Sequence, residues 1–220
     1  MAATPVKEEE FDESVYENMM IPTPVGDFYT VPYRGLLVAD VRNDADRFKD
    51  ATDVLRFLVQ HDPRRVNHSQ KLIRNGAGDP IVFLQRKMTS LHYRWSAYLG
   101  DKESEENYLF TMRMPSGIHK HVKFHIFLPG NLDKKSPDFV VKGEFKDHTY
   151  TISHRDVPVA QIVKKLDIEA IKLDKKDYAM KLCPGADHAF VISVVSIIEQ
   201  LNVDGFLPKL SRNPSTKIVK

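Results

Sequence analysis

Histidine and lysine alternate in the middle of the chain, where residues 118 to 126 read Ile-His-Lys-His-Val-Lys-Phe-His-Ile. On a β-strand, His119, His121, Lys123 and His125 would share one face. Alternate histidines can bind zinc, but no cysteine or carboxylate follows at ligand spacing, and the charge of Lys123 would repel a metal ion. The pattern therefore favours either a phosphate-binding face or the solvated outer face of a barrel strand.

A second group of cations lies at the ends of neighbouring β-type runs. Arg86 and Lys87 end one run, and Arg94 starts the next. Arg113 and Lys120 flank the turn from 114 to 117. Guanidinium and ammonium groups suit phosphate oxygens, so these hairpin ends predict an anion site. Edge charges that prevent aggregation of strands are the ordinary alternative, and it stays open. The candidate residues for binding an anionic head group are Arg86, Lys87, Arg113, Lys120 and Lys123.

Motifs for catalysis are absent from the sequence, which has no Gly-x-Ser-x-Gly, His-Glu-x-x-His or paired-carboxylate signal. The glycines of Gly76-Ala77-Gly78 are not followed by Gly-Lys-Ser/Thr, so this stretch predicts a hairpin turn instead of a phosphate loop. We therefore expect a binding protein, not an enzyme, with no cofactor and no metal.

An apolar segment from His188 to Leu201 constrains the fold more than any of these sites, since its only formal charge is Glu199. Its polar residues fall within about a third of a turn at 100° per residue, whereas at period 2 they scatter over both faces. Asp187 is a suitable N-cap, so the pattern predicts a helix.

The expected helix is roughly 21 Å long, short of the roughly 30 Å of a bilayer core. A helix that is apolar on most sides must then be surrounded by protein. The residues expected in its buried core are Phe190, Val191, Val194, Val195 and Ile198.

About twelve short β-type runs separated by turn signals precede this segment. The expected strands are 36–41, 54–59, 70–74, 81–87, 91–99, 107–113, 120–128, 138–145, 148–153, 157–165, 168–173 and 178–182. Tight turns imply antiparallel neighbours, and so large a sheet with one apolar face must close. The fold class is therefore mainly β, a closed antiparallel barrel of about twelve strands around a C-terminal hydrophobic helix. The charged segment from Arg42 to Thr52 is interpreted as a surface loop or a helical turn.

The two ends of the chain differ in charge. Residues 1–17 hold six acids and one lysine, and residues 209–220 hold four cations and no acid. We expect a disordered acidic tail over 1–20, a single barrel domain over 21–210 and a flexible basic tail over 211–220. The lone cysteine, Cys183, permits no intramolecular disulfide, and no apolar leader is visible, so we expect an intracellular protein.

The order of these pieces resembles the plant LURP-one-related family. The stretch from Ile81 to Trp95 is similar to that family's hairpin of apolar strand, Arg-Lys, Met, Ser and Trp. The stretch from Asp138 to Phe145 is similar to its Phe-x-Val-x-Gly strand, and Asp187 to Asn202 to its Asp-Tyr-Ala-Phe helix. The resemblance covers residues 72–202, and before Leu72 the chain departs from it. There the segment from Arg42 to Thr52 resembles an insertion.

What this resemblance implies is a tubby-like barrel, related to that of phospholipid scramblases, and a link to plant defence signalling. Tubby domains bind phosphoinositide head groups through basic residues on the barrel wall. We therefore expect docking on a phosphoinositide membrane surface, with a protein-interaction or transcription-regulating scaffold as the alternative and scramblase-like lipid handling as a weaker one. The expected location is cytoplasmic, at the plasma membrane periphery or in the nucleus. The net charge of +2 argues against nucleic acid as a ligand, and the sequence does not define the oligomeric state.

Overall fold

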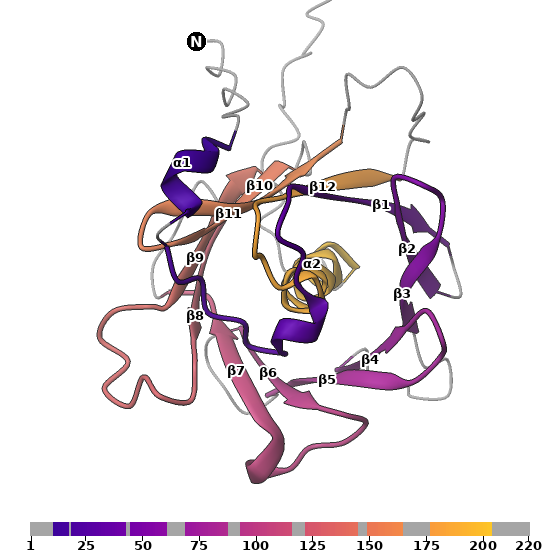
Figure 1. Ribbon diagram of the computed structural model, residues 1–220. Coiled ribbons are helices and arrows are strands. Elements are labelled where there is room, and N and C mark those ends of the chain that lie inside the picture. The colour runs from indigo at the N-terminus through magenta and orange to yellow at the C-terminus, as the bar shows by residue number, and fades with distance from the viewer. Residues whose placement is uncertain are drawn as a thin grey trace, which may run out of the picture.

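A computed structural model describes residues 11–17, 19–42, 45–60, 69–87, 93–115, 122–144, 149–164 and 177–203. Twelve antiparallel strands close into a barrel, and one long helix lies inside it (Figure 1). The strands are β1 Gly35–Val41, β2 Ala45–Asp50, β3 Leu55–Gln60, β4 Gln70–Asn75, β5 Pro80–Arg86, β6 Arg94–Leu99, β7 Tyr108–Arg113, β8 Val122–Phe127, β9 Phe139–Glu144, β10 Thr149–His154, β11 Val157–Val163 and β12 Tyr178–Leu182. The helices are α1 Glu13–Tyr16 and α2 His188–Val203, with 3₁₀ turns η1 Asp27–Tyr29 and η2 Glu105–Asn107.

The sheet closes because its first and last strands pair. Each strand from β1 to β12 pairs with its neighbour in the chain, and β1 also pairs with β12, with Leu37 opposite Met180. This closure leaves the sheet without an exposed edge. A sheet of this size with one apolar face must close in this way. The predicted barrel of antiparallel strands around a helix is confirmed.

The helix α2 fills the interior of the barrel, as the view along the barrel axis shows (Figure 1). The five residues expected in its core, Phe190, Val191, Val194, Val195 and Ile198, are all 0–2% exposed. The ring of Phe190 packs against Phe139 and Phe110, with centroid distances of 4.6 and 5.2 Å. Ser193 donates a hydrogen bond to the carbonyl of Ala189, which lets a polar side chain lie in an apolar core.

The charged segment from Arg42 to Thr52 is neither a loop nor a helical turn. Most of it forms β2, which pairs with β1 on one side and with β3 on the other, so it belongs to the barrel wall and is not an insertion. Only Phe48 contributes an apolar side chain to the core cluster. Backbone pairing with two apolar neighbours therefore determines this strand, more than its own pattern does.

Another expected strand, 168–173, lies outside the described residues. The strands on either side of it, β11 and β12, pair directly with each other, with Ile162 opposite Met180. The barrel therefore has its twelve strands without the expected strand 168–173, because β2, which was not expected, is one of them.

A segment before β1 crosses one end of the barrel, over the N-terminus of α2 (Figure 1). This crossing segment, residues 19–34, follows α1 and includes η1. The backbone NH of Gly185 donates to the carbonyl of Val31, and the hydroxyl of Tyr16 donates to the carbonyl of Pro158. Phe11 is buried in the core cluster. The expectation of a disordered tail up to residue 20 is therefore wrong for residues 11–17, because this acidic stretch carries aromatic side chains that pack on the barrel.

Candidate functional site

Cations from adjacent strands face one another on the outside of the barrel. The backbone NH of Lys87, just after β5, donates to the carbonyl of Arg94 at the start of β6. Arg94 is directly opposite Arg113 of β7, and Arg113 is directly opposite His125 of β8. Arg94 and Arg113 alternate with Trp95 and Met112, which lie in the core, so both face outward.

A second pair extends this surface across the next two strands. Lys123 of β8 is directly opposite Lys142 of β9. Both alternate with core residues, since Phe124 and Val141 are fully buried. We call Lys87, Arg94, Arg113, Lys123 and Lys142 the basic wall. Like charges directly opposite each other destabilise a sheet, so two such pairs side by side favour an anionic ligand that offsets the repulsion.

Aromatic packing fixes the orientation of Arg113. Its guanidinium lies over the ring of Phe127, 4.4 Å from the ring centroid, and the His125 ring meets the same ring edge-to-face at 6.3 Å. Alternation with the core residues of β8 places Phe127 on the outer face, yet its side chain is buried. Stacking on an aromatic face leaves the edge of a guanidinium free to meet a phosphate.

The loop between β8 and β9 lies next to Arg113. The guanidinium of Arg113 donates to the carbonyl of Lys134 at 3.4 Å. In the same loop Leu132 is 89% exposed, and the side chains of Lys134 and Lys135 also face solvent. The loop that contacts Arg113 thus also holds an exposed aliphatic side chain and two further lysines, of which Lys135 pairs with Asp133 at 4.0 Å.

Lys87 differs from the other members of the wall because a carboxylate partly neutralises it. Its ammonium forms an ion pair with Glu103, and the hydroxyl of Tyr98 donates to the same carboxylate oxygen at 2.9 Å. The hydrogen bond from Lys87 lowers the pKa of Glu103, and the hydrogen bond to Glu103 raises the pKa of Lys87. Lys87 therefore stays charged, with Glu103 as a counter-ion that an anionic ligand would have to displace.

The structure separates the residues predicted to form the anion site. Lys87, Arg113 and Lys123 lie together on the basic wall. Arg86 lies on the same face of β5 as Val82 and Leu84, which are in the core, so it does not belong to the outward face. Its guanidinium stacks over Tyr93, 4.7 Å from the ring centroid. Lys120 lies outside the described residues. Arg94, noted at the start of the next run, was left out of the five predicted site residues, and Lys142 was missed. The same period-2 alternation that placed Lys123 outward applies to both.

Other chemistry has little support in the described residues. No group of three or more His, Cys, Asp or Glu residues there could hold a metal ion. Burial raises the pKa of the Cys183 thiol to about 12, so this buried thiol is no nucleophile. Among the helices in this part of the chain, none is long and apolar enough to cross a membrane.

The sequence matches one family model over most of its length. The model is described as LURP-one-related, and it matches residues 39–199, which include β2 and α2. The chain belongs to the LURP-one-related family. The family match begins at residue 39, within β1, and covers the segment from Arg42 to Thr52, which agrees with β2 being part of the barrel wall.

Curated relatives from Arabidopsis thaliana agree with this assignment. Protein LURP-one-related 15 is 31% identical over 137 residues, which span 61% of this chain and 63% of that relative. Protein LURP1 is 26% identical over 159 residues, covering 71% of this chain and 76% of that relative.

A solved structure supports the fold. An X-ray structure of an Arabidopsis thaliana protein matches with a TM-score of 0.64 and 24% sequence identity, covering 81% of this chain and 97% of the other. At this identity the likeness concerns the fold alone. The family and the closed barrel around a central helix together make this LURP-one-related chain tubby-like in fold.

Proposed function

We propose that this protein docks on anionic phospholipid head groups, phosphoinositides in particular, through the basic wall. The observation that carries the proposal is the row of outward cations directly opposite one another on β6 to β9. The role of each is to donate hydrogen bonds to phosphate oxygens, with no catalytic step. The protein would then be peripheral at a membrane, and the expected link to defence signalling stays a prediction.

The magnitude of the electrostatic attraction is sufficient for reversible docking. A basic residue near an anionic membrane surface contributes about 1 kcal/mol. Arg94, Arg113, Lys123 and Lys142 would together supply several kcal/mol, with Lys87 discounted because Glu103 neutralises it. The exposed Leu132, in the loop whose Lys134 carbonyl accepts from Arg113, supports a lipid surface over a soluble phosphate, since an aliphatic side chain gains free energy by leaving water.

The proposal is tested by co-sedimentation with liposomes at physiological salt, with phosphatidylinositol bisphosphate compared against charge-matched phosphatidylserine. We expect the wild-type chain to pellet selectively with the phosphoinositide. The double variant Arg94→Gln/Arg113→Gln should lose most of this binding, because it removes both guanidinium forks. Lys123→Gln/Lys142→Gln should weaken it as well.

The matched control is Lys49→Gln/Arg74→Gln, which removes the same net charge on β2 and β4, away from the basic wall. Equal loss in the control and in Arg94→Gln/Arg113→Gln would mean that diffuse charge alone binds the membrane. No pelleting of the wild type with either lipid would overturn the proposal and favour a protein partner instead.

A further inference from the structure

A cavity of about 730 Å³ opens at the end of the barrel where α2 begins. Its walls come from η1 and the residues that follow it, from the turn between β2 and β3, and from the turn between β4 and β5, with His188 of α2 among the lining residues. The volume is within the roughly 300–1,000 Å³ typical of small-molecule sites. The basic wall is at the opposite end, since Lys87 follows the end of β5 and this cavity adjoins its start.

Aromatic side chains line the cavity and its rim. The rings of Tyr29 and Phe57 lie 5.9 Å apart by their centroids. Phe28 and Tyr33 also line it, yet they are 90% and 65% exposed. Large rings left in water next to a concave site gain free energy when another ring covers them, so the walls favour a planar apolar ligand.

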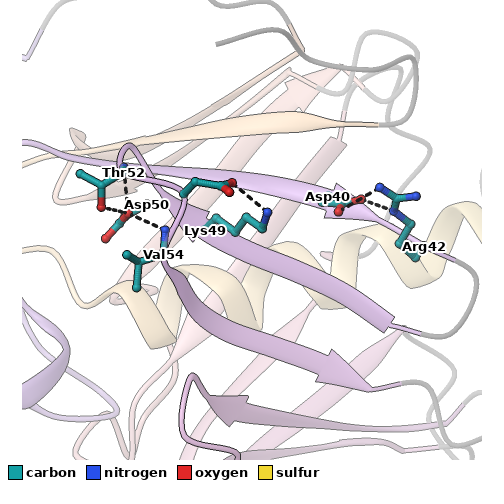
Figure 2. A network of polar contacts seen from close by, with 7 residues as sticks. Asp40, Arg42, Lys49, Asp50, Thr52 and Val54 are labelled. Carbon is teal, nitrogen blue, oxygen red and sulfur yellow. Dashed lines mark hydrogen bonds and ion pairs between the residues drawn. The ribbon is translucent and has the colours of Figure 1, made fainter. Parts of the chain in front are cut away.

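Asp50, at the turn between β2 and β3, holds the guanidinium of Arg56 of β3 at this cavity. Asp50 accepts hydrogen bonds from the backbone NH groups of Thr52 and Val54 and from the Thr52 hydroxyl through one oxygen (Figure 2). Its other oxygen accepts a hydrogen bond from Nε of Arg56 and forms an ion pair with Nη2 of the same residue at 2.7 Å. These hydrogen bonds lower the pKa of Asp50 to about 2, and the one from the Thr52 side chain has the largest effect. The carboxylate is therefore ionised, and both of its oxygens are engaged in these contacts.

This arrangement leaves one edge of Arg56 uncommitted. Both contacts of its guanidinium with Asp50 go through Nε and Nη2, and within the described part of the chain Nη1 donates to no group. The side chain of Arg56 is 55% exposed and lines the cavity. Arg34 also lines it and donates to the carbonyl of Phe11. Asp50 is the only carboxylate among the described residues that line the cavity, and it is the one paired with Arg56.

His188 adds a neutral polar group. Its buried Nε2 has no hydrogen-bond partner in the structure, as far as the residues are described. Burial, with a smaller effect of the Arg56 charge, lowers the pKa of His188 to about 4, so the imidazole is uncharged at neutral pH. His188 therefore adds an uncharged polar ring to the lining, and the free edge of the Arg56 guanidinium is the group that can bind a carboxylate.

We propose that this cavity is a binding site for a small aromatic carboxylate. The ring would lie among Tyr29, Tyr33 and Phe57, and the carboxylate would accept hydrogen bonds from Nη1 of Arg56 beside His188. The site is independent of the basic wall, and because it is at the other end of the barrel, a membrane-docked protein could still bind such a ligand.

The proposal is tested by isothermal titration of the full chain with 2-naphthoate and with its neutral analogue 2-naphthalenemethanol. We expect saturable one-to-one binding of 2-naphthoate, and binding of the alcohol at least about tenfold weaker. The variant Arg56→Gln should weaken binding of the carboxylate about tenfold or more, because a hydrogen bond to a charged group is lost. The matched control Arg74→Gln, in the neighbouring strand and outside the cavity, should bind like the wild type.

Ala51→Trp provides a second variant that places a bulky ring in the cavity from an exposed turn position. It should abolish binding of both probes, and thermal unfolding should show that it and Arg56→Gln remain folded. Absence of saturable binding by the wild type would overturn the proposal. So would undiminished 2-naphthoate binding by either folded variant, or equal affinity for the alcohol, which would exclude a carboxylate site.

Discussion

At the scale of single residues, Asp187 joins the start of α2 to the segment that crosses the barrel end. Its Oδ1 accepts from the backbone NH of Phe190 at 2.9 Å, as predicted for an N-cap. Its Oδ2 accepts from the backbone NH groups of Val25 at 2.7 Å and Gly26 at 3.3 Å. Burial raises the pKa of Asp187 to about 6, although these NH groups lower it in part.

A pH dependence of stability follows from this raised pKa. Between about pH 4 and pH 6 the folded protein keeps a proton on Asp187 that the unfolded chain releases, so the contribution of this group to stability falls as pH rises. A rise of the pKa from the ordinary 3.8 to about 6 changes the free energy of unfolding by at most about 3 kcal/mol over this range. Urea unfolding from pH 4 to pH 7.5 should show the stability of wild type relative to Asp187→Asn decreasing over that range.

His188 also titrates in this range but with the opposite sign. Its folded pKa of about 4 is below its ordinary 6.5, so its contribution to stability falls as the pH drops through this interval. Because both proteins keep His188, its effect cancels in the comparison. The asparagine variant will differ in overall stability, since its amide cannot accept every NH group, but that offset is independent of pH. A constant difference across the range would refute the role of Asp187.

At the scale of elements, the hairpin of β9 and β10 depends on a glycine. Gly143 is directly opposite Tyr150. A Cβ atom at Gly143 would lie 2.1 Å from the carbonyl oxygen of Thr149 and 2.8 Å from the Cα of Tyr150. These are backbone atoms, which cannot move aside without breaking the ladder between the two strands.

Gly143→Ala should therefore destabilise the protein by about 3 kcal/mol or more, through overpacking against the backbone. Gly130→Ala is the matched control, because a Cβ there meets no atom within 4 Å and its change should stay within about 0.5 kcal/mol. Thermal unfolding of the two variants would measure this difference. Similar melting temperatures would contradict the close approach of β9 and β10.

The same elements show how far the sequence predicts the structure. Period-2 alternation in β8 and a compact polar arc in α2 predicted both elements, because each buries one consistent face. β2 was missed because a strand paired on both sides needs only one core side chain, Phe48. Lys71 is likewise inside the barrel, 4% exposed, where its ammonium donates to the carbonyl of Ser196. Such a contact, 125 residues away along the chain, leaves no local signal.

The candidate site was predictable in part for the same reason. Alternation places Lys123 and Arg113 outward, but which cations meet depends on strand register, which pairs Arg94 with Arg113 and Lys123 with Lys142. Register depends on contacts between strands and not on the pattern within one strand. The cavity at the other end combines three turns and α2, so no single stretch of sequence could indicate it.

At the scale of the whole molecule, the barrel wall and its filling are different parts of the chain. All twelve strands precede α2, whose apolar residues are almost completely buried. Each buried aliphatic or aromatic side chain contributes roughly 1.5–3 kcal/mol, far more in sum than the net stability of a typical domain. A chain ending at Leu182 should therefore not form a stable barrel, although it contains every strand.

Circular dichroism with urea unfolding would check this prediction. The chain ending at Leu182 should show no cooperative transition, whereas one ending at Val203 should unfold cooperatively like the full chain. A cooperative transition in the shorter chain would mean that the strands hold together without the helix.

The position of α2 after all twelve strands also matters during translation. The ribosome releases the residues of β1 to β12 before those of α2, so for some seconds the nascent strands exist with their apolar faces uncovered, at roughly 5–20 residues per second. Neighbouring strands can pair in turn as they are made, but the sheet cannot close until β12 is available to pair with β1. The nascent chain would need a chaperone over this interval, and a ribosome stalled between β12 and α2 would yield an aggregation-prone product.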